Sequence, residues 1–309
     1  IDVEVRTFLR NSALFTGGPG AVAGAIGLNA QITQVPEGFR IEVRGGGRDI
    51  GIGQALVDGL FQGETDLSLT LVVGEEITLE GLNLVTPHVS LFASGNLTEG
   101  QRALELSGQL DNSARFTGGR AGPLEFNASV TQQGAAYALT LDATGTNIGI
   151  GNPVVDGLLT GTSRVTMRGT YDTGNGTLAL SRFTFDGNAL DMTASGTVGT
   201  DAIDLSFNAQ LDDLGRLESN LRGPLTVRGD IGRSGDTTRL DVNVQGPGGT
   251  TATVSGRILL PDGGVDLAIN GSAPLALANP FLTPGSLTGL ARFDLRMSGQ
   301  PGLDALSGP

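Results

Sequence analysis

The chain has 309 residues, of which 50 are glycine, and its 32 Asp+Glu outnumber its 19 Lys+Arg, which gives a formal net charge of −13. The absence of cysteine excludes disulfides and thiolate metal centres, and the negative charge disfavours binding to nucleic acid. No apolar run reaches the roughly 18 residues of a transmembrane helix, and no signal peptide is recognisable. We therefore expect an internal segment of a longer protein.

Along most of the chain apolar and polar residues alternate, which is the pattern of strands with one apolar and one wet face. Clusters of Gly, Asn, Asp and Pro separate the alternating segments and predict tight turns between antiparallel strands. The alternation is clearest over 137–143, 190–198 and 203–211. Helical spacing is confined to four short segments: Gln54–Leu60, Asn152–Leu159, Asp212–Leu221 and Leu277–Leu282.

Comparison of the chain with itself indicates an internal repeat. Apolar residues from Ile77 to Leu97 match those from Leu178 to Val198, 101 residues later. The alternation slips between Leu79 and Leu82, and again between Leu180 and Phe183. The recurrence predicts the same β-bulge in both copies.

Other segments repeat at different offsets. Residues 50–60 match 148–158 at an offset of 98, and 287–296 match 159–168 at an offset of 128. We predict one continuous repetitive β domain over 1–309. Its approximate repeats are 14–114, 115–216 and a divergent, shortened third over 217–309.

The apolar face of such a sheet needs a cover, and no predicted helix is long enough to provide one. Packed sandwiches, a closed barrel and an open groove remain as alternatives. Long linkers between sandwich domains are absent, and 12 Phe, 2 Tyr and no Trp are a poor signal for a membrane barrel. We expect an all-β fold: an elongated, curled antiparallel sheet with a few short helices between strand groups. Gly95 and Gly196 would let its apolar face bend.

The residues expected to line the apolar groove are mostly large aliphatic or aromatic side chains at alternating positions. They are Leu28, Ile41, Leu69, Leu91, Leu106, Phe126, Leu139, Leu141, Met167, Phe183, Phe185, Leu190, Met192, Leu205, Phe207, Val227, Val242, Phe293 and Leu295.

The segment Gly285–Leu303 reads Gly-x-Leu-x-Gly-x-x-Arg-Phe-Asp-Leu-Arg-x-Ser-Gly-x-Pro-x-Leu. It resembles the repeats of TamB, the translocation and assembly module subunit, which is grouped with the AsmA-like, repeating β-groove proteins. The Asn152-Pro153 and Asn279-Pro280 elements, followed by Leu-Thr-Gly and a strand, resemble the same repeats.

This resemblance implies a β-taco with a hydrophobic interior in the periplasm of a diderm bacterium. Its parent chain would be anchored in the inner membrane and would meet the outer-membrane barrel TamA. The implied role is non-enzymatic: lipid transport, in which glycerophospholipid acyl chains occupy the groove between the two membranes, and help in outer-membrane protein assembly. The resemblance supplies no catalytic residue, cofactor or metal.

Residues with catalytic potential have simpler interpretations. His88 is the only histidine, and its repeat counterpart is Ala189, so we expect it on a loop. The acidic pairs Asp212–Asp213 and Glu75–Glu76 are expected in turns. Asp58 and Asp156 recur in Val-Asp-Gly and are expected to cap or turn the chain, and Gly51-x-Gly53 and Gly149-x-Gly151 lack the third glycine of a dinucleotide loop.

Two other functions remain open. A secreted β-solenoid adhesin or passenger domain suits the acidic, cysteine-free composition, although parallel β-helices repeat every coil of about 20–30 residues. A carbohydrate-active enzyme would need a convergent pair of acids, and the repeats show none.

Overall fold

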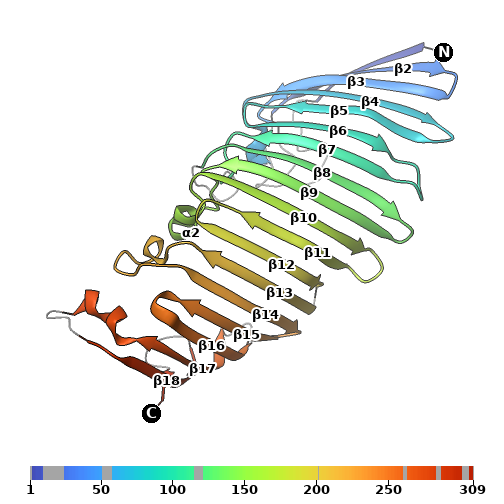
Figure 1. The fold of residues 1–309 in the computed structure, drawn as a ribbon. Coiled ribbons are helices and arrows are strands. Elements are labelled where there is room, and N and C mark those ends of the chain that lie inside the picture. The colour runs from blue at the N-terminus through green and yellow to red at the C-terminus, as the bar shows by residue number, and fades with distance from the viewer. Residues whose placement is uncertain are drawn as a thin grey trace. The chain divides into compact units, whose positions relative to one another are not determined.

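The computed structural model describes residues 2–9, 24–50, 58–114, 121–200, 202–259, 263–282, 287–300 and 306–308. The chain divides into two compact units, one of residues 1–156 with 160–165, the other of residues 157–159 with 166–309. Antiparallel strands make up most of each unit (Figure 1). The prediction of an all-β, antiparallel fold with a few short helices is confirmed.

In the first unit each strand pairs with the next one along the chain, always antiparallel. Short turns of the kind that glycine and polar residues favour join most of them. The strands are β1 (Asp2–Leu9), β2 (Ile26–Val35), β3 (Gly38–Arg48), β4 (Glu64–Gly74), β5 (Ile77–Val85), β6 (Val89–Asn96), β7 (Ala103–Leu110), β8 (Leu124–Gln133) and β9 (Ala136–Thr146).

The second unit continues the same arrangement. From β11 to β19 each strand pairs antiparallel with its successor, and β10 lies beside β11. The strands are β10 (Thr162–Asp172), β11 (Thr177–Asp186), β12 (Leu190–Val198), β13 (Ala202–Leu211), β14 (Leu225–Ser234), β15 (Thr237–Gly246), β16 (Thr250–Leu259), β17 (Gly264–Pro274), β18 (Leu290–Gly299) and β19 (Leu306–Ser307).

The helical segments are short. They are η2 (Gly59–Phe61), α2 (Pro153–Leu158), η4 (Leu214–Arg216), η5 (Pro247–Gly249) and η6 (Leu275–Phe281). The predicted helix at Gln54–Leu60 is described only from residue 58. The prediction of a helix over Asp212–Leu221 was too long, because Asp213 accepts hydrogen bonds from the backbone N–H groups of both Gly215 and Gly223 at 3.0 Å and folds the segment into a loop.

The predicted bulges are confirmed in both copies. The register between β5 and β6 shifts between Leu79 and Leu82, and the register between β11 and β12 shifts between Leu180 and Phe183. An extra residue in one strand restores the alternation after the slip. As a result the large apolar side chains before and after each bulge stay on the same face.

Hydrogen bonds outside the strands recur at the offsets of the sequence repeat. In each copy the chain leaves one strand, makes a connection and enters another strand. The backbone N–H at the start of the connection donates to the carbonyl of the glycine at its end, and the three copies of this bond are 98 and 128 residues apart. The three bonds are Asp49 N to Gly63 O (2.9 Å), Asn147 N to Gly161 O (2.7 Å) and Leu275 N to Gly289 O (3.0 Å). The boundaries of the three repeats stay a prediction.

A small buried cluster lies at one end of the strands of the second unit. Leu158, Ala189 and Leu211 form it, and Leu214 and Leu225 pack against it. Because Leu211 and Leu225 are directly opposite each other in the β13–β14 register, this cluster covers the end of an apolar face and leaves the middle of the strands outside it.

Candidate functional site

The pairing register of the first unit assembles three rows of uncharged side chains across β2 to β9. Directly opposite residues of an antiparallel pair share a face. One row is Ala30, Val43, Leu69, Leu82, Ala93, Leu106, Ala128 and Leu141; the next is Leu28, Gly45, Leu67, Leu84, Leu91, Gly108, Phe126 and Ala143; the third is Ile32, Ile41, Leu71, Leu79, Gly95, Leu104, Val130 and Leu139. We call these three rows the first apolar face.

The second unit has an equivalent surface, the second apolar face, across β11 to β18. Its rows are Phe185, Met192, Ala209, Val227, Val244, Ala252, Gly271 and Phe293; Phe183, Ala194, Phe207, Gly229, Val242, Val254, Ile269 and Leu295; and Leu180, Gly196, Leu205, Ile231, Leu240, Gly256, Leu267 and Met297.

These registers group most of the predicted lining residues on two faces, one in each unit. The eight from Leu28 to Leu141 all lie on the first apolar face, and all those from Phe183 onward except Leu190 are in the rows of the second. Leu190 is on the same side, opposite Leu211. Met167 lies in β10, half-buried next to the exposed Arg168. Whether these side chains contact a lipid stays a prediction.

Most side chains of both apolar faces are partly exposed. Leu79 and Ala93 are buried, at 7 % and 5 % exposure, whereas Leu69, Leu106 and Leu139 are only half-buried. A six-residue helix such as α2 spans about 9 Å, but eight strands span about 34 Å. Among the described residues, therefore, no helix is long enough to cover either face.

Two glycines shape these faces at matching positions. Gly95 and Gly196 have φ of 148° and 137°, a region that side-chain-bearing residues rarely adopt. A Cβ atom on Gly196 would lie 2.0 Å from the carbonyl oxygen of Asp204 in the neighbouring strand. These values show why glycine is needed at both positions. That the two glycines let the apolar face bend stays a prediction.

His88 has a partner in a loop. Its Nδ1 lies 3.0 Å from Oδ2 of Asp111. The repeat counterparts, Ala189 and Asp212, keep only a backbone hydrogen bond, from Asp212 N to Ala189 O at 3.0 Å. Among the described residues no three His, Asp or Glu side chains form a group that could hold a metal ion.

The acidic residues singled out in the sequence serve as caps and turns. Asp213 accepts from Gly215, Gly223 and Arg222, and the two backbone hydrogen bonds are the main cause that lowers the pKa of its carboxyl. Asp156 accepts from the backbone N–H of Ile150 at 2.7 Å. Glu75 and Glu76 lie in the turn between β4 and β5, and Asp58 precedes η2 without a side-chain cap bond.

Of the two Gly-x-Gly pairs weighed as dinucleotide loops, only Gly149-x-Gly151 lies among the described residues. Gly149 donates its N–H to Ser113 Oγ at 3.1 Å, within the protein itself. Gly51 and Gly53 lie outside the described residues.

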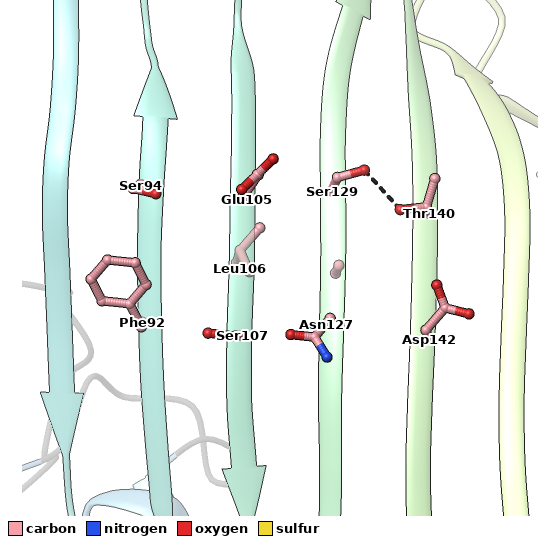
Figure 2. A pocket seen from close by; sticks show the side chains of 10 residues that line it. Phe92, Ser94, Glu105, Leu106, Ser107, Asn127, Ser129, Thr140 and Asp142 are labelled. Atoms are coloured by element: carbon pink, nitrogen blue, oxygen red, sulfur yellow. Dashed lines mark hydrogen bonds between the residues drawn. The ribbon is translucent and has the colours of Figure 1, made fainter.

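Hollows also occur on the opposite, polar faces. From the alternation pattern we predicted only that these faces contact water. One in the first unit has a volume of about 360 Å³ and is lined by side chains of β6 to β9, including Phe92, Glu105, Asn127 and Asp142 (Figure 2). The sequence signal for it is Phe92, an aromatic residue between Ser90 and Ser94 at a position of polar-face parity.

Comparisons with known proteins leave the family open. No family model matches the chain, and no match was found among curated proteins or solved structures. No helix among the described residues is long and apolar enough to cross a membrane. The resemblance to the repeats of TamB therefore stays a prediction.

Proposed function

We propose that the chain is a non-enzymatic lipid-conducting scaffold. Its apolar faces bind the acyl chains of glycerophospholipids and carry them between the inner and outer membranes, and the chain assists outer-membrane protein assembly. The observation that supports the proposal is the set of uninterrupted, uncharged and half-exposed rows on each apolar face.

The physical basis is burial of apolar surface. Each methylene of an acyl chain that leaves water contributes about 0.8 kcal/mol. This term has no preferred direction, and the rows contain no charged side chain that would fix a lipid at one place. An acyl chain can therefore move along such a face with little change in free energy.

The cellular setting of the proposal comes from the resemblance. In this proposal the chain lies in the periplasm of a diderm bacterium, as a segment of a parent chain with an inner-membrane anchor and the outer-membrane barrel TamA as partner.

Strand pairing supports the lipid scaffold over the secreted adhesin or passenger domain. A parallel β-helix pairs each coil with the next in parallel, with a repeat of about 20–30 residues. Neighbouring strands here run antiparallel through hairpins, as between β2 and β3. Adhesion stays the second candidate.

The test is lipid analysis of the purified chain. Mass spectrometry after mild purification should find bound phospholipid, and Leu139→Asp and Phe207→Asp should each reduce it strongly, because an unpaired charge against acyl chains is costly. Ala138→Asp and Asn208→Asp are the matched controls, since each puts the same charge on the adjacent polar-face position. Equal lipid content in all four variants would contradict the proposal, as would an absence of lipid in the unmodified chain.

A further inference from the structure

A second candidate binding site lies on the polar face of the first unit, on the other side of the sheet from the first apolar face. The hollow of about 360 Å³ lies over β6 to β9 (Figure 2). Two cross-strand rows line it: Phe92, Ser107, Asn127 and Asp142 in one, and Ser94, Glu105, Ser129 and Thr140 in the other. The volume is within the range of small-molecule sites, about 300–1,000 Å³.

Several polar groups of the hollow lack a partner in the part of the chain that the structure describes. Ser129 and Thr140 share a hydrogen bond of 2.7 Å. The side chains of Ser94, Glu105, Ser107 and Asn127 make no hydrogen bond or ion pair with any described residue. Together they offer hydroxyl and amide donors as well as hydroxyl, amide and carboxylate acceptors.

Phe92 supplies the apolar part. Its side chain is 47 % exposed in the middle of a polar surface, beside Gly81 of β5. Because nearly half of this side chain is exposed, a flat apolar ligand surface can pack on the ring.

Charge narrows the class of ligand. No Arg or Lys lines the hollow, whereas Glu105 and Asp142 do, so phosphate-bearing and other anionic ligands are repelled. A cation would use the carboxylates and the ring but would leave the amide and hydroxyl donors without an acceptor. A neutral polyhydroxyl compound has both donors and acceptors.

We propose that this hollow binds a neutral saccharide. The C–H side of a sugar ring packs on Phe92, and its hydroxyls donate to Glu105 and exchange hydrogen bonds with Ser107 and Asn127. Leu106 and Ala128 of the first apolar face also line the hollow. This inference nevertheless does not depend on the lipid function, because the ring and the polar groups that it uses belong to the polar-face rows.

The repeat supplies a natural comparison within the same chain. A hollow of about 530 Å³ lies over β11 to β13, and its lining includes Thr193, Ser195, Ser206 and Asn208, which lie 101 positions after Phe92, Ser94, Glu105 and Ser107. There Thr193 replaces Phe92, Ser206 replaces Glu105, and Ser206 donates to Asp230. The second hollow thus has no ring at the position of Phe92 and no carboxylate at the position of Glu105, although Arg182, Phe183 and Phe207 also line it.

The experiment measures binding of chitotetraose and maltotetraose to the full chain by saturation-transfer NMR and calorimetry. We expect one saccharide site, and a loss of about tenfold in affinity for Phe92→Thr because the stacking contact disappears. Glu105→Ser should weaken binding similarly, since it removes a charged acceptor. Both substitutions introduce the residue that β12 or β13 already carries at the matching position, and urea midpoints check that the variants remain folded.

The reverse substitution completes the test. Thr193→Phe combined with Ser206→Glu should add a second saccharide site. The proposal is overturned if neither tetrasaccharide binds, or if binding is unchanged in Phe92→Thr. It is also overturned if spermidine binds instead and is released at high salt, since that result identifies a cation site.

Discussion

Asn147 and Gly161 hold each other through two hydrogen bonds. The Asn147 N–H donates to Gly161 O at 2.7 Å, and the Gly161 N–H donates to Asn147 Oδ1 at 2.8 Å. Asp49 and Gly63 form the same pair 98 residues earlier, at 2.9 and 2.8 Å. Both Asn147 and Asp49 have positive φ, 50° and 53°, a conformation that Asn and Asp tolerate better than other side chains.

Asn147→Ala should therefore lower the free energy of unfolding by about 2–3 kcal/mol, because it loses a hydrogen bond and keeps an unfavourable φ. Asn147→Asp should change it by less than about 1 kcal/mol, since Asp49 performs the same role in the earlier copy. Urea unfolding measures both. Equal effects of the two substitutions would show that the side-chain bond does not contribute.

Gly196→Ala should destabilise the second unit by more than about 2 kcal/mol, because the new methyl group meets the Asp204 carbonyl and φ is 137°. Gly157→Ala, in α2, is the control. Nothing lies within 4 Å of its Cβ position, so it should be neutral or stabilising by up to about 1 kcal/mol. Urea midpoints of the two variants compare the effects, and a mild result for Gly196→Ala would mean that the strands shift at little cost.

The alternation pattern was sufficient to predict the fold class and the members of each apolar face. Side chains two apart in a strand share a face, so Leu139 and Leu141 are assigned together without knowledge of their neighbours. The bulge at Leu79 and Leu82 could also be predicted, because a slip in alternation changes parity in the sequence itself.

Other features depend on pairing that alternation does not specify. The hollow beside Phe92 exists because Ser107, Asn127 and Asp142 are opposite one another in the register of β7, β8 and β9. The helix predicted over Asp212–Leu221 rested on the helical spacing of its leucines. In the structure, backbone N–H groups donate to the Asp213 carboxylate and close the segment as a loop. Local periodicity does not report such side-chain-to-backbone competition.

Removing two buried hydroxyls should raise stability. Thr65 and Ser163, 98 residues apart, are 3 % and 2 % exposed, and their hydroxyl oxygens have no hydrogen-bond partner among the described residues. The third copy has Ala291 at the equivalent place. Ser163→Ala and Thr65→Val should each add about 1 kcal/mol to the free energy of unfolding. Urea denaturation measures the change. A lower free energy of unfolding in the variants would instead indicate that each hydroxyl holds a buried water.

Acid sensitivity should depend in part on Asp213. Its two backbone hydrogen bonds, with a smaller contribution from Arg222, lower the pKa of the carboxyl in the folded state. The ionised form therefore stabilises the fold. This contribution is fully present above the unfolded pKa of about 3.9 and is lost as the pH falls through the lower folded pKa.

The matched variant is Asp213→Asn, because Asn112 occupies the equivalent position 101 residues earlier and accepts from Ala114 and Ala121 in the same way. It keeps an oxygen for the backbone donors but cannot titrate. The free energy of unfolding of the native chain should exceed that of the variant at neutral pH, and the difference should shrink below about pH 4. Urea titrations at neutral and acidic pH measure both curves. A constant difference across this range would assign the role of Asp213 to geometry alone.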